Sequence, residues 1–135
     1  MEFRIYYEDT DAGGVVYHAR YLAFFERGRC EFLRSRGLSV RDLAEAGHVF
    51  PVVRLEIDYK APAVLDDLVR VETEVLEVGR SSFTMGQQVV RALDGRLLAA
   101  GKVTLVCVGP GMKAKRLPEE VLRALQEQGS REGAD

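Results

Sequence analysis

Apolar and polar positions change their period early in the chain. Residues Phe3–Glu8 alternate weakly between apolar and polar side chains, which predicts a strand. Over about His18–Arg36, apolar residues recur at three- and four-residue steps with charged residues between them, and this predicts a long amphipathic helix. Gly37 is placed to end that helix in the left-handed conformation, and Ser39 is placed to begin a second, short helix.

Beyond the second helix, apolar residues recur at every second position. Alternation predicts four further strands, at Val53–Lys60, Val69–Leu76, Ser82–Ala92 and Leu97–Val108. Asp94-Gly95 predicts a tight hairpin between the last two strands, and a final helix is expected over Glu119–Gln126. This order predicts an α+β fold, with an antiparallel sheet of about five strands packed against the long helix. The last four strands are expected to form an unbroken meander.

The last strand carries a further signal. Leu97–Ala100 and Val103–Val108 are apolar at both odd and even positions, which means on both faces of the strand. A strand with one face in water instead alternates between apolar and polar residues. The long helix covers one face of the sheet, and little chain remains to cover the other. We therefore expect a homo-oligomer, a dimer or a tetramer, whose partner subunit covers the second face.

The composition fits one folded domain over residues 1–135, with a polar tail at 127–135 that we expect to fray. The net charge of −2 argues against bulk electrostatic binding to nucleic acid.

We expect a cytoplasmic protein without a membrane span. No apolar run reaches the roughly 18 residues of a span, no apolar signal segment stands at the N-terminus, and the two cysteines show no pairing pattern. The absence of asparagine and the excess of arginine over lysine suit a thermophile, although genome base composition gives the same bias.

Several classes of chemistry lack their sequence signals. The two histidines, His18 and His48, and the two distant cysteines do not form a metal-ligand spacing. No Gly-x-Ser-x-Gly elbow, phosphate-binding loop or dinucleotide fingerprint occurs. We therefore expect neither a metal ion nor a cofactor.

The segment Tyr6–His18 concentrates the residues able to do chemistry. It places two aspartates, Asp9 and Asp11, a histidine and two adjacent glycines in a loop that leads into the long helix. Unpaired N–H groups at a helix N-terminus could hold a developing oxyanion, and an aspartate could act as a base or a nucleophile. The same residues also suit a plain helix-entry loop, in which Asp and Thr cap turns.

A dense resemblance to the 4-hydroxybenzoyl-CoA thioesterase family is carried by residues 6–34, Y-Y-E-D-T-D-A-G-G-V-V-Y-H-A-R-Y-L-A-F-F-E-R-G-R-C-E-F-L-R. Within the family, this run is most similar to the acyl-CoA thioesterases of the YbgC type, which are associated with the Tol-Pal system. The resemblance implies a hotdog fold, in which the sheet wraps round the long helix, subunits pair edge to edge and active sites lie at the interface. It also implies hydrolysis of an acyl-CoA to a free acid and CoA.

The resemblance assigns roles residue by residue. Asp11 matches the catalytic carboxylate, as general base or nucleophile. His18 matches a histidine typical of the YbgC branch, with amides near Val16–His18 polarising the thioester carbonyl, and Tyr7 matches a tyrosine that lines the site. Because the hydroxybenzoyl branch typically lacks this histidine, the resemblance favours an aliphatic acyl group. Asp9 is the competing carboxylate, which could instead cap the loop or pair with an arginine.

The phosphates of CoA need cationic partners. Two groups could supply them: Arg80, Ser81 and Ser82 at the start of a strand, and Lys113, Lys115 and Arg116 past the last strand. Either group also suits a solvated surface. Glu26 on the long helix is expected to be a buried, paired carboxylate with a structural role, and His48 to be a loop residue able to border the pocket.

Two other functions stay open. One is a hotdog hydratase or dehydratase acting on acyl-CoA or acyl-carrier protein, which normally has a carboxylate on the long helix facing a histidine. Asp11 precedes the helix instead. The other is a non-catalytic acyl-CoA-binding module, which would not need Asp11 and His18 together.

Overall fold

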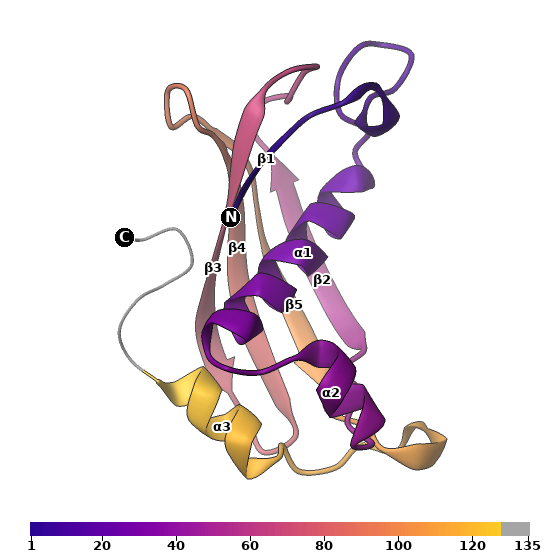
Figure 1. Cartoon of the computed structure of the whole chain (residues 1–135). Helices are drawn as coiled ribbons and strands as arrows, with labels where there is room; N and C mark the ends of the chain where they lie inside the picture. The colour runs from indigo at the N-terminus through magenta and orange to yellow at the C-terminus, as the bar shows by residue number, and fades with distance from the viewer. Residues whose placement is uncertain (128–135) are drawn as a thin grey trace.

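A five-stranded antiparallel sheet packs against one long helix in the computed structural model, which describes residues 1–127 (Figure 1). The strands are β1 Glu2–Arg4, β2 Val52–Tyr59, β3 Leu68–Val78, β4 Ser82–Arg91 and β5 Leu97–Val106. The helices are α1 Arg20–Ser35, α2 Val40–Glu45 and α3 Glu119–Gln126, with single 3₁₀ turns at Tyr7–Asp9 and Pro110–Met112. Apart from Glu127, the expected frayed tail lies outside the described residues. None of the helices described within residues 1–127 is long and apolar enough to cross a bilayer.

The strand order is β1-β3-β4-β5-β2, so the expected unbroken meander is wrong. β2 pairs with β5 rather than with β3, because β1 occupies the outer edge of β3. The most apolar strand, β5, thereby takes an interior position between β4 and β2. Gly101 permits the close approach of β2, since a Cβ there would lie 2.4 Å from the Glu56 carbonyl oxygen. The arrangement leaves β2 as a long edge strand.

Helix α1 lies across β3 and β4, on the face that its periodicity predicts. Its buried positions are Tyr21, Phe24, Phe25, Gly28, Phe32 and Leu33. A Cβ at Gly28 would lie 2.6 Å from Val71 Cγ1, so only glycine allows the helix to lie this close to β3. Beneath it, Gln87 Nε2 donates to the Phe25 carbonyl at 2.8 Å and to Thr73 Oγ1 at 3.0 Å. These two bonds satisfy the buried amide and fix the helix on the sheet.

The ends of the first two elements differ from the sequence prediction. The expected strand Phe3–Glu8 stops at Arg4, because the chain turns at Tyr6, whose N–H donates to Asp9 Oδ2 at 2.9 Å. The long helix begins at Arg20 rather than near His18. Gly37 has φ +84° after the helix, and the Ser39 hydroxyl accepts from the Asp42 N–H at the start of α2, as predicted.

Part of the apolar signal in β5 comes from a bulge. The β4–β5 register shifts at Val89/Val90, and both Leu98 and Ala99 are fully buried within the one chain. On the outer face of β5, Lys102 is exposed and Thr104 is half-buried. The apolar pattern of β5 therefore does not by itself require a partner subunit, and the expected oligomer stays a prediction.

Candidate active site

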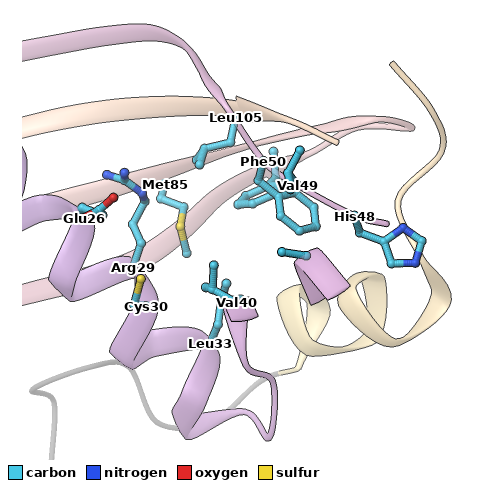
Figure 2. A pocket seen from close by; sticks show the side chains of 12 residues that line it. Glu26, Arg29, Cys30, Leu33, Val40, His48, Val49, Phe50, Met85 and Leu105 are labelled. Carbon is cyan, nitrogen blue, oxygen red and sulfur yellow. The ribbon is translucent and has the colours of Figure 1, made fainter. Parts of the chain in front are cut away.

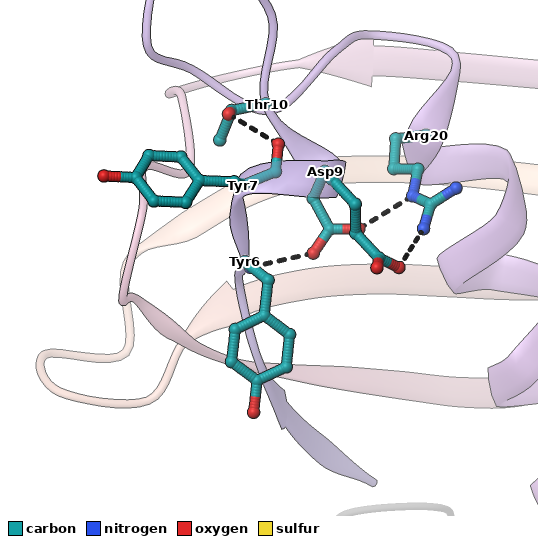
Figure 3. A network of polar contacts seen from close by, with 6 residues as sticks. Tyr6, Tyr7, Asp9, Thr10 and Arg20 are labelled. Carbon is teal, nitrogen blue, oxygen red and sulfur yellow. Dashed lines mark hydrogen bonds and ion pairs between the residues drawn. The ribbon is translucent and has the colours of Figure 1, made fainter.

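The loop between β1 and α1 is held in shape by Asp9, which is only 5% exposed. Its Oδ1 accepts from Arg20 Nε at 2.8 Å, while its Oδ2 accepts from the Tyr6 N–H (Figure 3). The Tyr7 carbonyl accepts from the Thr10 hydroxyl at 2.9 Å, and the Tyr7 ring points away from this network and is 79% exposed. Asp9 therefore braces the loop through Arg20, one of the roles expected for it, and both of its oxygens are occupied.

Asp11 lies at the exposed tip of the same loop, within a tight turn. Its N–H donates to the Val15 carbonyl at 2.8 Å, and its carbonyl accepts from the Gly14 N–H at 3.0 Å. Gly14 has φ +82°, which the turn requires. The carboxylate Oδ1 accepts from the Gly13 N–H at 2.8 Å, and within residues 1–127 no donor contacts Oδ2. One oxygen thus orients the carboxylate and the other is open.

The N-terminus of α1 presents unpaired amides. Its N-cap residue, Ala19, provides no side-chain cap. The Val16 and Tyr17 N–H groups donate to the Ala63 and Asp9 carbonyls at 2.9 and 3.0 Å. These two amides are therefore occupied, contrary to the expectation that the whole stretch near Val16–His18 is available. In the described part of the chain, the His18 and Ala19 N–H groups have no acceptor. They carry the partial positive charge of the helix terminus.

His18 is held by Tyr59, the last residue of β2. The Tyr59 hydroxyl donates to the His18 carbonyl at 2.7 Å, and the two rings meet edge to face at 6.4 Å. The His18 ring also contacts the Tyr17 ring at 4.5 Å. His18, Tyr21 and Tyr59 line an open hollow of about 310 Å³ beside the helix entrance. Burial raises the pKa of Tyr59 above its usual value.

The two groups proposed for CoA phosphates lie at the same end of the sheet. The Leu117 N–H donates to the Arg80 carbonyl at 2.9 Å, and the Cys107 N–H donates to the Ser81 carbonyl at 2.7 Å. The first bond places the residue after Arg116 beside the β3–β4 turn, whereas the Lys113 carbonyl accepts from the Gly109 N–H. We call Arg80, Ser81, Ser82, Lys113, Lys115 and Arg116 the basic cluster. The Lys115 ammonium group already has one hydrogen-bond partner, because its Nζ donates to the Gly47 carbonyl at 3.0 Å.

The catalytic candidates and the basic cluster lie at opposite ends of one chain. Asp11 and His18 belong to the indigo and violet loop at one end of the sheet, whereas the β3–β4 turn and the orange segment after β5 lie at the other (Figure 1). β2 connects these ends, from Val52 near the basic cluster to Tyr59 beside His18. Its eight residues span roughly 25 Å. A single chain does not bring the two groups together.

An apolar cavity of about 120 Å³ lies at the basic-cluster end, between α1, α2 and the inner face of β4 and β5 (Figure 2). His48 and Phe50 border it, as the sequence allowed for His48. Glu26 also borders it but is exposed and makes no ion pair within residues 1–127, so its expected burial and pairing are wrong. The charged face of α1 reaches the rim of the cavity, whereas the apolar face of the same helix contributes to the cavity wall.

Sequence reasoning missed Tyr59 and the cavity. Tyr59 lies 41 residues from His18, and their contact depends on where the folded sheet places β2. The cavity walls come from α1, α2, β4, β5 and the segment between α2 and β2, and no local pattern indicates that a space remains among them.

Comparisons with known proteins agree with this architecture. A family model described as the thioesterase-like superfamily matches residues 6–125. Acyl-CoA thioester hydrolase YbgC of Escherichia coli is 43% identical over 120 residues, which cover 88% of this chain and 89% of that protein. Acyl-CoA thioesterase YbgC of Haemophilus influenzae is 48% identical over 123 residues, or 90% and 89% of the two chains. The crystal structure of Slr0204, a 1,4-dihydroxy-2-naphthoyl-CoA thioesterase from Synechocystis, aligns with a TM-score of 0.88 and 27% identity over 94% of each chain.

The sheet, the long helix and the loop at its entrance define a hotdog-fold thioesterase. This chain belongs to the thioesterase-like superfamily, and its resemblance to the YbgC-type enzymes is confirmed.

Proposed function

We propose that this thioesterase hydrolyses acyl-CoA, with Asp11 as the general base and the His18 and Ala19 amides as the oxyanion site. The observation that carries the proposal is the pairing of one open carboxylate oxygen with unpaired amides in a single braced loop. The printed names of the YbgC relatives support the acyl-CoA substrate. His18 and Tyr7 would line the site, with Tyr59 orienting the His18 backbone.

The reaction follows from these groups. Asp11 takes a proton from a water molecule as the water oxygen bonds to the thioester carbon. The carbonyl oxygen becomes an oxyanion, which accepts from the His18 and Ala19 amides. When the intermediate collapses, the C–S bond breaks, the thiolate of CoA leaves and Asp11 returns the proton to it. A thiol is a good leaving group, so the reaction needs no stronger acid and no cofactor.

Direct attack by Asp11 is the competing route. The carboxylate would form a mixed anhydride with the acyl group and release the thiolate, and water would then hydrolyse the anhydride. A single turnover in H₂¹⁸O detects an anhydride that is hydrolysed at the Asp11 carbonyl. The base mechanism places ¹⁸O only in the acid product, whereas the nucleophile mechanism followed by attack at the Asp11 carbonyl leaves ¹⁸O in Asp11.

A dimer would bring the two ends of the site together. β2 pairs only on its β5 side within residues 1–127, and its Val53, Leu55, Ile57 and Tyr59 remain partly or fully exposed. Two copies related by a two-fold axis perpendicular to the sheet would pair their β2 edges antiparallel. Tyr59 of one copy would then lie near the Val52 end of the other. Because Tyr59 holds His18, the catalytic loop of one copy would meet the basic cluster of its partner.

The test of the reaction is hydrolysis of a panel of acyl-CoAs, followed by thiol release. We expect turnover by the wild type and a loss of about 10³-fold or more in kcat for Asp11→Asn. Glu120→Gln is the control, because Glu120 is an exposed carboxylate on α3, at the opposite end of the molecule from the loop. Full activity of Asp11→Asn would overturn the assignment of the base. Tight binding of acyl-CoA without turnover by the wild type would favour the binding module.

The test of the shared site is subunit mixing. Asp11→Asn inactivates the loop, and the double variant Arg80→Glu/Arg116→Glu weakens the basic cluster. A mixed dimer would carry one site with both defects and one site with none, so it should recover about half of the wild-type activity. If loop and cluster served the same site within one chain, the mixture would recover nothing.

A further inference from the structure

We propose that residues 39–48 form a lid over the cavity between α1, α2 and the sheet, and that Lys115 is the positioning residue that holds this lid closed when the phosphates of CoA bind. The lid consists of α2 and the residues on either side of it. This inference rests on the proposed function, because the ligand that closes the lid is the CoA part of the substrate.

The lid lies between two fixed points of the chain. Before it, the Leu38 N–H donates to the Leu33 carbonyl at 2.9 Å, at the end of α1. After it, Val49 and Val108 exchange two backbone hydrogen bonds, at 2.9 and 3.1 Å. The chain is therefore tied to the body of the protein on both sides of residues 39–48.

A glycine stands near each of these points. Gly37 and Gly47 have φ of +84° and +91°, and a Cβ at either position would meet nothing within 4 Å. The backbone thus has space to turn at both glycines. Small residues at the ends of an element often absorb the backbone rotation of a moving lid.

Few contacts hold the lid itself. Leu43 is the one buried residue among residues 39–48. The backbone hydrogen bonds of the lid stay within it, as in the bond from the His48 N–H to the Leu43 carbonyl at 2.8 Å. Within residues 1–127, one hydrogen bond joins the lid to the rest of the chain, from Lys115 Nζ to the Gly47 carbonyl at 3.0 Å. Little burial and little external hydrogen bonding make a segment prone to local opening.

The lid separates the cavity from solvent. Val40 and Ala44 of α2 line the cavity, and both are exposed on their other side. Figure 2 shows Val40 across this space from Leu105 of β5. The wall opposite the lid includes Phe83 and Met85, which are fully or almost fully buried. Movement of the lid would therefore open the cavity without disturbing the sheet.

Lys115 reaches the lid from a fixed base. Its N–H donates to the Cys107 carbonyl at 2.9 Å, just past β5. Its side chain crosses Gly109, where a Cβ would lie 3.3 Å from both Cδ and Nζ. Lys115 is partly buried on this path, whereas Lys113 and Arg116 are exposed. Of these three cations of the basic cluster, Lys115 alone contacts the lid.

The same ammonium group can hold the lid and a phosphate together. An ammonium has three donors, and the Gly47 carbonyl uses one of them. Phosphate oxygens would accept from the other two in charge-assisted bonds. A bound phosphate would then fix the Lys115 side chain against Gly47, so binding of CoA would shift the lid toward its closed position.

The closed lid leaves one buried polar atom unsatisfied. His48 Nδ1 has no hydrogen-bond partner within the described residues, and Figure 2 shows the His48 ring at the opposite end of the cavity from Glu26. A buried nitrogen without a partner costs free energy that water recovers once the segment opens. This cost brings the closed and open positions closer in free energy, so one hydrogen bond can shift the balance between them.

Amide hydrogen exchange of residues 39–48, followed by mass spectrometry, measures the lid without turnover. The six-residue α2 does not stay folded once it is detached, so opening exposes its amides. Lys115→Met should speed this exchange about tenfold, and the conservative Lys115→Arg should restore it. Lys113→Met is the matched control, because it removes an equal charge from the same segment without touching Gly47. Exchange that is unchanged in Lys115→Met would overturn the latch.

His48→Phe tests the lid with the opposite sign. This variant removes the unsatisfied nitrogen and should slow exchange of residues 39–48 about fivefold. General destabilisation of the fold cannot slow exchange, and the amides of β4 serve as the internal reference. A lid that exchanges as slowly as β4 in the wild type and in both variants would overturn the proposal.

The coupling to CoA is tested with adenosine 3′,5′-bisphosphate, which carries nucleotide phosphates but no pantetheine arm that could enter the cavity. At saturation it should slow lid exchange about threefold or more in the wild type and in Lys113→Met, and leave Lys115→Met unchanged. Asp11→Asn should show the same slowing as the wild type, so the lid is tested apart from the catalytic base.

Two results would contradict this coupling. Binding of the bisphosphate without a change in lid exchange would overturn the role of Lys115 in closure. No binding, measured by calorimetry, would overturn the phosphate role of the basic cluster and the coupling with it, whereas the comparison of Lys115→Met with Lys113→Met in the absence of ligand would still decide the latch.

Discussion

The Tyr59 hydroxyl donates a 2.7 Å hydrogen bond to the carbonyl of His18, across 41 residues of sequence. The bond ties the last residue of the edge strand to the residue whose amide is free at the entrance of α1. It therefore fixes the peptide plane next to the proposed oxyanion site.

Tyr59→Phe should leave the chain folded and lower kcat by a few-fold to about tenfold, because a lost neutral hydrogen bond at this point loosens the His18 backbone. Steady-state hydrolysis measures this. The control is Tyr17→Phe, since the Tyr17 ring also contacts His18 but its hydroxyl has no partner within residues 1–127. Equal activities of the two variants would show that the bond does not position the site.

Asp9→Asn should lower the free energy of unfolding by about 1–3 kcal/mol, because it removes the charge that Arg20 and the Tyr6 N–H contact in a nearly buried place. Thermal unfolding measures this effect. Asp11→Asn, two residues away and exposed, should unfold at the wild-type temperature while losing activity. The reverse outcome, a stable Asp9→Asn and an unstable Asp11→Asn, would exchange the two roles.

Gly28→Ala should destabilise the protein by about 1–3 kcal/mol. Alanine alone favours a helix over glycine by about 1 kcal/mol, but its Cβ would lie within 3.0 Å of three side-chain atoms, on Val71, Thr73 and Gln87. The sign of the change in a denaturant titration decides between the two effects. A stabilised variant would mean that α1 does not pack this closely on β3.

The β4–β5 hairpin should contribute a pH-dependent part of the stability. The Arg91 guanidinium and the Arg96 N–H lower the pKa of Asp94 from 3.8 to about 2. A carboxyl group whose pKa is lowered in the folded state adds stability above its unfolded pKa and loses it as the pH falls toward the folded value. The difference in melting temperature between the wild type and Asp94→Asn should be present at pH 7, shrink below about pH 4 and vanish below about pH 2. A difference independent of pH would show that the pair is not the cause.

The local parts of this molecule were accessible from the sequence. The buried stripe of α1 and the caps at Gly37 and Ser39 depend on residues within a few positions of one another. The pairing of β2 with β5 was not accessible from the sequence. β1 and β2 could each occupy either edge of the sheet, and only the assembled sheet determines which edge each takes. The apolar pattern on both faces of β5 predicts a covering partner subunit, whereas the bulge at Leu98 accounts for part of that pattern within one chain.

The candidate site also has parts that the local sequence predicts and parts that it does not. The loop that contains Asp11 and His18 is one continuous segment with a dense motif, so the sequence was sufficient to single it out. The brace from Tyr59, the occupied Val16 and Tyr17 amides and the exposed position of Glu26 all depend on how distant segments pack. None of these features can be recognised from the spacing of residue types in the local sequence.

The free edge of β2 also matters for how the protein behaves before it reaches a partner. An eight-residue edge strand without proline is a template for pairing with any extended chain, and such edges drive aggregation in newly made proteins. Its outer face carries three exposed charged residues, Arg54, Glu56 and Asp58. Charged side chains on an edge strand oppose pairing with other chains. Assembly of two copies would therefore protect the chain in a crowded solution as well as complete its chemistry. Variants that weaken this contact should be recovered as insoluble protein more often than as inactive monomers.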